Sequence, residues 1–146
     1  MKYRSLESGI QLPQILSSLL IASAISLGVG GIFLFVDNLV PTVLVETTFI
    51  AVVLLLILSN FVSKGNMLSI NISTILGIVA PIMSYATPAH DGVLEQITTG
   101  GLISFLGILQ LLGFYIFPIT FVLLRIVYNG KLKNQIIHSS KTLVKS

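Results

Sequence analysis

The sequence predicts an all-α integral membrane protein: an antiparallel bundle of four transmembrane helices with both termini in the cytoplasm. Two observations carry the prediction. Hydrophobic residues make up 54% of the 146 residues and charged residues only 9%, and the apolar residues form long unbroken runs. Each crossing of the hydrocarbon core takes about 20 residues. The chain therefore has room for four crossings and no separate soluble domain, and we expect one membrane domain over residues 1–146.

The first predicted helix covers residues 12–36 and has Pro13 in its first turn, where the missing N–H of a proline leaves no bond unmade. The N-terminus also has features of a secretory signal, since basic residues precede the apolar run and Ala22-Ser23-Ala24 offers small residues for cleavage. The apolar run, however, continues to Val36. We therefore expect the first helix to be retained.

Two of the predicted helices carry small residues at three- or four-residue intervals. Small residues allow a neighbouring helix to approach closely, although they are also common in membrane helices generally. The residues predicted to pack against other helices are Ser18, Ala22, Ser26 and Gly30 in the first helix and Ser73, Gly77, Ala80 and Ser84 in the third.

The second predicted helix covers residues 39–61 and contains one acidic residue, Glu46. With Pro41 in the first turn, Glu46 lies about 6–9 Å into the helix, a depth from which a carboxylate still reaches the interface. We favour this interfacial placement. The alternative is a buried carboxylate that binds a proton or a cation.

The third and fourth predicted helices cover residues 68–86 and 100–127, and each contains a proline that predicts a kink, Pro81 and Pro118. A proline inside a helix removes a backbone donor, so a neighbouring group must satisfy the carbonyl that it leaves free. The fourth helix also contains Gln110. We expect its side chain to hydrogen-bond to a neighbouring helix, with a place in a pore or quinone pocket as the alternative.

The charged residues separate by side of the membrane. With four crossings, the basic residues all fall on the side of the two termini, and the positive-inside rule makes this side the cytoplasm. The basic tail, residues 128–146, is expected to lie there against anionic lipid headgroups. The opposite side is predicted to carry an acidic rim that docks a partner, composed of Asp37, Glu46, His90, Asp91 and Glu95.

The residue types present exclude several kinds of chemistry. There is no cysteine, and the two histidines, His90 and His138, fall on opposite sides of the membrane and cannot share a haem. One histidine and two acids in a loop are a weak metal site. There is also no G-x-S-x-G motif and no phosphate-binding glycine loop with a lysine. We expect no catalytic residue, no metal and no cofactor bound by this chain alone, structural lipids apart, and no nucleic-acid partner.

The function predicted from these observations is that of a non-catalytic accessory or structural subunit in a larger complex of the cell membrane, such as a respiratory or other oxidoreductase assembly. Its partners would be other membrane subunits. The alternative is a small oligomeric ion- or proton-coupled transporter or channel that uses Glu46, Gln110 and the proline kinks. In size the chain is similar to small multidrug-resistance transporters, but its first helix lacks the acidic residue typical of them.

Overall fold

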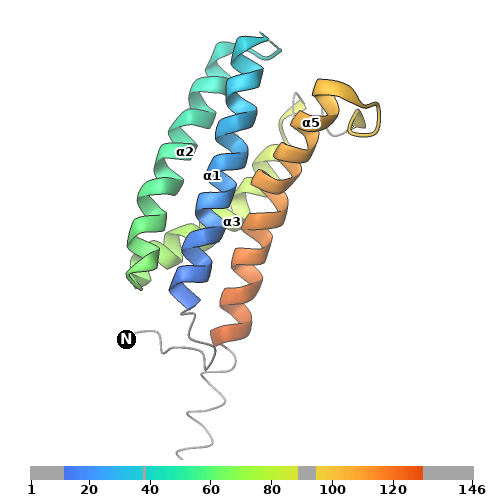
Figure 1. The fold of residues 1–146 in the computed structure, drawn as a ribbon. Coiled ribbons are helices and arrows are strands. Elements are labelled where there is room, and N and C mark those ends of the chain that lie inside the picture. Colours follow the sequence, from blue (N-terminus) through green and yellow to red (C-terminus); the bar gives the residue numbers. More distant parts are fainter. Residues whose placement is uncertain (1–11, 38, 89–94, 130–146) are drawn as a thin grey trace, which may run out of the picture.

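The computed structural model describes residues 12–37, 39–88 and 95–129, and it is helical throughout the apolar runs (Figure 1). Four helices in these residues are long and apolar enough to cross a membrane. The prediction of an all-helical chain is thereby confirmed for the described residues, and the four helices fit a multi-pass membrane protein. The elements are α1 (Leu12–Val36), α2 (Thr42–Ser63), α3 (Met67–Tyr85) and a fourth span, Gly101–Asn129, which contains α5 (Gly101–Gln110) and the π-helical η1 (Leu111–Ile116).

The helix ends follow local chemistry. α2 begins three residues later than predicted, because Pro41 is its N-cap, with an extended ψ of 140°. α3 begins at Met67, where the side chain of Asn66 accepts a hydrogen bond from the Ser69 N–H at 3.1 Å. This bond satisfies one of the N–H groups that a helix leaves unpaired at its start.

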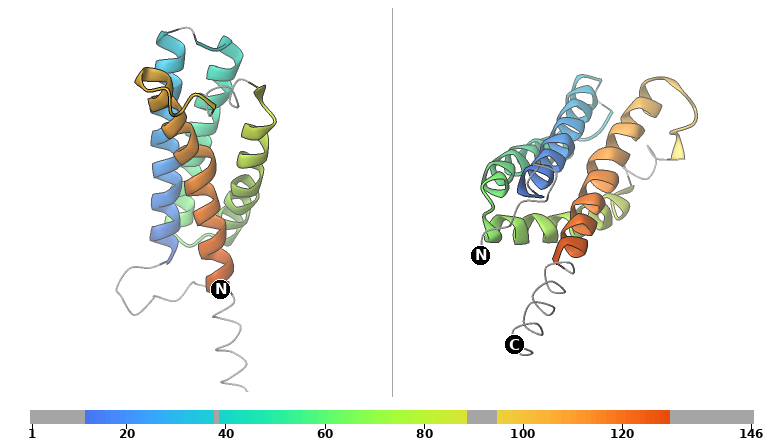
Figure 2. Two further views of the ribbon diagram at one scale, coloured as in Figure 1. Left: turned by 90° about the vertical axis from the view of Figure 1, so that its right-hand side faces the viewer. Right: turned by 60° about the horizontal axis from the view of Figure 1, so that its bottom comes forward.

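α1 is the central helix of the bundle. α2 lies alongside it on one side and the fourth span on the other, while α3 crosses at a steep angle (Figures 1 and 2). In α1, 39% of the most apolar stretch is buried inside the bundle, whereas in the other three spans the buried share is 17% to 28%. α2 and α3 are close at the turn that connects them and diverge from there (Figures 1 and 2).

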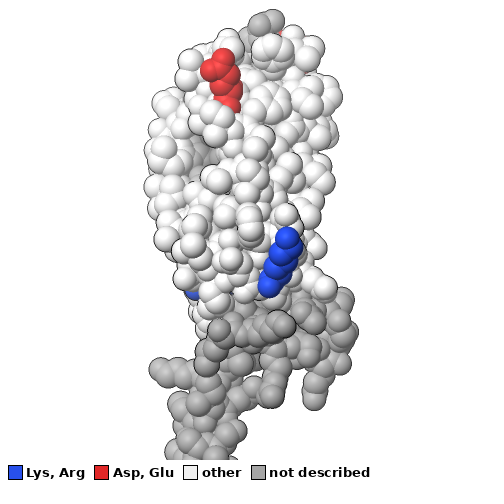
Figure 3. All heavy atoms as spheres, turned by 90° about the vertical axis from the view of Figure 1, so that its left-hand side faces the viewer, with Lys and Arg blue, Asp and Glu red and all other residues white. Residues whose placement is uncertain are grey.

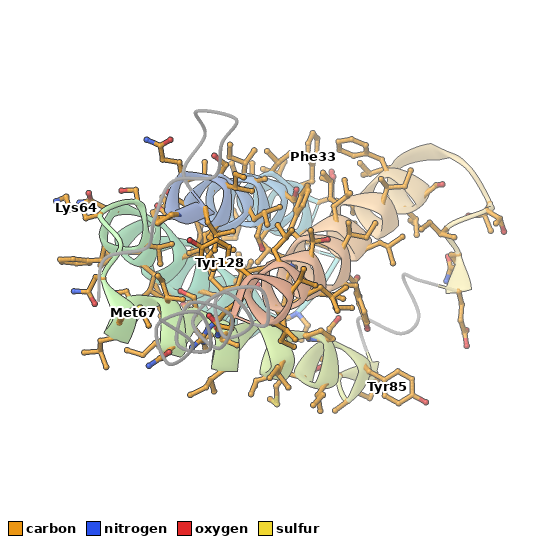
Figure 4. All side chains as sticks on the ribbon, turned by 90° about the horizontal axis from the view of Figure 1, so that it is seen from below. Phe33, Lys64, Met67, Tyr85 and Tyr128 are labelled. Carbon is orange, nitrogen blue, oxygen red and sulfur yellow. The ribbon has the colours of Figure 1, made fainter. Side chains whose placement is uncertain are left out.

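The hydrophobic core gathers at the end of the bundle where α2 and α3 meet. Tyr128 lies among the helices at this end, whereas Tyr85 points away from the bundle (Figure 4). Much of the remaining apolar surface is exposed, as expected for side chains that face lipid. The buried core residues are Leu12, Leu16, Leu20, Leu58, Val62, Ile70, Phe121 and Tyr128.

The predicted small-residue stripe of α1 does not form one contact face. A four-residue step turns a helix about 40° beyond a full turn, so three steps turn the stripe by about 120°. Ser18 is accordingly exposed, and its hydroxyl bonds to the Gln14 carbonyl of the same helix at 2.9 Å. Ala22 is half-buried, while Ser26 and Gly30 are buried.

α1 instead presents small residues to two different neighbours. Gly30 lies against Leu109 of the fourth span, and a Cβ on it would be 3.8 Å from the leucine Cβ. A Cβ on Gly31 would be 3.4 Å from the methyl group of Thr48 in α2. The Ser17 hydroxyl also donates to the Ser59 carbonyl of α2 at 2.9 Å. α1 therefore contacts α2 and the fourth span through two different sets of small residues.

The small residues of α3 behave differently. They follow one another at intervals of four, three and four residues, and these eleven residues rotate around the helix by only about 20° more than three full turns. Ser73, Gly77 and Ser84 are buried and Ala80 is half-buried. Gly77 faces the fourth span closely, since a Cβ there would lie 3.1 Å from the Pro118 carbonyl oxygen. This set stays on one face and packs inward.

Candidate functional site

A cavity of about 200 Å³ lies among the four spans. Its walls are almost entirely apolar, and every span contributes to them. The lining includes Leu20 and Ser23 of α1, Leu54 of α2, Ser73 and Val79 of α3, and Pro118 of the fourth span. Leu54 and Val79 are about 42% and 41% exposed, respectively. The cavity is therefore only partly enclosed.

One wall of the cavity is shaped by Pro118. In a regular α-helix the Phe117 N–H would bond to Gly113, but here it donates to the Leu112 carbonyl, one residue further back. The next donor along the chain is residue 118, and a proline has none. The Gly113 carbonyl is therefore left without a partner in its own helix. Pro118 causes this loss of a helical donor, and the π-helical turn η1 lies just before it in the chain.

The free Gly113 carbonyl is satisfied from α1. The buried hydroxyl of Ser23 donates to it at 2.6 Å. The two helices are in close contact there, because a Cβ on Gly113 would lie 2.7 Å from a methyl carbon of Leu27. A glycine at position 113 and a hydroxyl at position 23 together join α1 to the fourth span beside the cavity.

A second serine of the cavity wall has no such partner. Ser73 is 1% exposed, and its Oγ has no hydrogen-bond partner among the described residues. Because Ser73 lies six residues into α3, it is about 9 Å along the helix from its start. A buried hydroxyl without a hydrogen-bond partner costs free energy.

The fourth span is also bonded to α3 at two places. Near the α5 end, the Gln110 amide Nε2 donates to the Ser84 Oγ at 3.3 Å. Towards the other end, the Arg125 guanidinium donates to the side chains of Asn71 and Thr74. Gln110 also lines a second, smaller pocket of about 40 Å³ between α1, α2 and the fourth span.

The predicted acidic rim is described in part. Asp37, Glu46 and Glu95 are exposed, whereas His90 and Asp91 lie outside the described residues. Glu46 is on the exposed side of α2 and is not among the described residues that line the cavity. Within residues 12–37, 39–88 and 95–129, no three histidine or acidic side chains come together in a group that could hold a metal ion.

The sequence analysis did not single out Ser23, Gly113 or Arg125 for these roles. The signal for the first pair was partial, because the four-residue rule for a proline in a regular α-helix points from Pro118 to position 114, and only the π-helical turn moves the affected carbonyl to Gly113. The identity of the donor depends on how the helices pack, which the sequence pattern does not specify.

Comparison of the chain with protein-family models, with curated proteins and with solved structures found no significant match.

Proposed function

We propose that the chain is a non-catalytic subunit of a larger membrane assembly, an antiparallel four-helix bundle that binds a partner through the exposed side of α2. The observation that carries the proposal is an acidic residue on a helix face that the chain leaves largely uncovered. α2 buries four of its 22 residues, Val45, Leu58, Ser59 and Val62, within the chain. Its exposed side carries Glu46, which lies about 6 Å from the start of α2, so its carboxylate can meet a polar or basic group of a partner at the interface.

The interior supports a structural role more than a transport role. Three polar contacts join helices in pairs: Ser23 with Gly113, Gln110 with Ser84, and Arg125 with Asn71 and Thr74. The cavity between the spans is apolar. An ion pathway through Glu46 and Gln110 would need both in one passage, but Glu46 is exposed on α2 while Gln110 bonds to α3.

The charges favour a bundle with both termini in the cytoplasm. On one face of the molecule the acidic and basic side chains lie towards opposite ends (Figure 3). Asp37 and Glu46 belong to the α1–α2 connection and the first turns of α2, whereas Lys64 follows the other end of α2. Under the positive-inside rule the Lys64 end faces the cytoplasm.

Co-purification tests the proposal directly. The tagged full-length protein, extracted from its own membranes in mild detergent, is expected to carry at least one other membrane protein in constant stoichiometry by mass spectrometry. Glu46→Gln should weaken this association. Thr47→Ala is the matched control, because Thr47 is also exposed and its hydroxyl bonds to the Val43 carbonyl of its own helix. A chain that purifies alone or as a homodimer contradicts the proposal.

A further inference from the structure

Arg125 carries a positive charge that its described surroundings do not balance. Of the two basic residues that the structure describes, Lys64 and Arg125, only Arg125 lies inside a membrane span. Its guanidinium donates to the side chains of Asn71 and Thr74 and, at 3.4 Å, to the Ile70 carbonyl. All three acceptors are neutral. In the part of the chain that the structure describes, the charge of Arg125 therefore has no counter-charge.

The guanidinium also has donors to spare at the surface of the bundle. It has five N–H groups, and the three bonds to α3 leave two of them without an acceptor among the described residues. Asn71 is exposed and Arg125 is half-buried. Arg125 is also four residues from the end of the fourth span, Asn129, or about 6 Å along the helix. A long side chain at this depth reaches the lipid headgroups.

An open apolar groove of about 330 Å³ lies next to this cation, between α3 and the fourth span. In the fourth span, Val122 of the groove precedes Arg125 by three residues, and in α3, Ile78 of the groove follows Thr74 by four. Residues at these spacings are neighbours on one helix face. The groove faces outward, because several of its lining residues are exposed: Ile78, Ile82, Ile119 and Leu123.

The groove has a length that suits a lipid acyl chain. Thr74 bonds to the guanidinium, and Ile82 lines the groove eight residues further on, about 12 Å along α3. Half of the hydrocarbon core of a bilayer is about 15 Å thick. A lipid whose phosphate lies at Arg125 therefore has its acyl chain beside the groove.

We infer that Arg125 and this groove bind one anionic phospholipid, with the lipid phosphate on the guanidinium and an acyl chain in the groove. A guanidinium binds phosphate oxygens through two parallel N–H bonds. The net charge of the lipid sets the preference, because phosphatidylcholine would bring a second cation to a guanidinium that lacks a counter-charge. The inference depends neither on the partner proposed for α2 nor on which side of the membrane the termini face.

A matched pair of photoreactive lipids tests the site. Phosphatidylglycerol and phosphatidylcholine with the same diazirine in the middle of one acyl chain are added separately, in trace amounts, to phosphatidylcholine vesicles that contain the purified full-length protein. After irradiation, the adducts are located by mass spectrometry. We expect phosphatidylglycerol to label the groove residues about tenfold more than phosphatidylcholine does, the equivalent of one hydrogen bond to a charged group. Both lipids should label Ile50, on the exposed side of α2, about equally.

Two results of this experiment would overturn the inference. Equal labelling of the groove by the two lipids would show that ordinary lipid covers it, or that a carboxylate from outside the described residues occupies the guanidinium. Excess inorganic phosphate should leave the preference for phosphatidylglycerol unchanged, because the acyl chain contributes to binding. A preference abolished by phosphate would show that Arg125 binds free anions.

Two variants separate the charged part of the site from the apolar part. Arg125→Gln should abolish the preference for phosphatidylglycerol in the groove. Lys64→Gln is the matched control, because it removes one positive charge from an exposed residue at the same end of the bundle and should leave the preference unchanged. Ile119→Trp narrows the groove and should reduce its labelling by phosphatidylglycerol to the level seen with phosphatidylcholine. The control Ile50→Trp, on the exposed side of α2, should have no effect.

The variants contradict the inference if the preference survives Arg125→Gln or falls equally in Lys64→Gln. Arg125→Gln also removes bonds to α3, so circular dichroism checks the helix content of each variant. If Arg125→Gln does not fold, Ile119→Trp decides, because it leaves the bonds of Arg125 in place. A preference that persists in Ile119→Trp would show that the groove does not hold the lipid.

Discussion

Ser23→Ala tests how the bundle tolerates a proline in the fourth span. The variant removes the hydroxyl that donates to the Gly113 carbonyl at 2.6 Å. No helical donor replaces it, because the Phe117 N–H goes to Leu112 and Pro118 has no N–H. A buried carbonyl left without a partner costs about 1–3 kcal/mol, and interhelical bonds in membranes are worth about 0.6–2 kcal/mol. We expect a loss of about 1–2 kcal/mol in the free energy of unfolding.

The proline makes this prediction specific. Pro118→Ala places an N–H at position 118 that can donate to the Gly113 carbonyl. Ser23→Ala should therefore cost much less stability in the Pro118→Ala background. The measurement is reversible unfolding in mixed detergent–dodecyl sulfate micelles, followed by circular dichroism for all four proteins of the double-mutant cycle. We expect a coupling energy of about 1 kcal/mol between the two sites.

Ser18→Ala is the control for the cycle, because Ser18 is an exposed serine of the same helix that bonds to its own backbone. It should change stability by a few tenths of a kcal/mol at most, about the effect typical of a surface substitution. An equal cost of Ser23→Ala in the two backgrounds, or a cost no larger than that of Ser18→Ala, would refute the reasoning.

Three further variants test other contacts in the same unfolding assay. Gly113→Ala should destabilise the bundle by about 1–3 kcal/mol, since its Cβ would lie 2.7 Å from a Leu27 methyl carbon. Gly28→Ala should be tolerated, because the nearest atom to its Cβ would be 3.9 Å away. Equal effects of the two variants would contradict the close contact at Gly113. Arg125→Lys should be nearly as harmful as Arg125→Gln, because only the planar guanidinium reaches two side chains of α3 at once; full rescue by lysine would argue against the pair of bonds. Asn66→Ala should cost about 1 kcal/mol through loss of the α3 N-cap, and an unchanged stability would show that the cap contributes nothing.

The helices could be predicted from the sequence because apolar length and composition determine them. The range predicted for the first helix coincides with α1, Leu12–Val36. The start of α2 differs from its prediction because Pro41 acts as an N-cap and not as a residue of the first turn. Such differences arise from the backbone angles of single residues, which hydropathy does not report.

The contacts between helices could be predicted only where the spacing keeps small residues on one face. The four-three-four spacing in α3 does so, whereas the constant four-residue spacing from Ser18 to Gly30 drifts around α1. The cavity was not predictable at all. Its lining residues come from all four spans, so its shape depends on packing between distant segments.

Crosslinking along α2 tests the proposed subunit role most directly. A photoreactive amino acid is placed in turn at Val43 and Ile50, which are about 69% and 70% exposed on α2, and at Leu123 and Ile126, which are about 55% and 60% exposed on the fourth span. After irradiation of the native membranes, we predict that both α2 positions crosslink the partner found by co-purification and that the fourth-span positions label mainly lipid. Lipid adducts at all four positions would contradict a docked partner on α2.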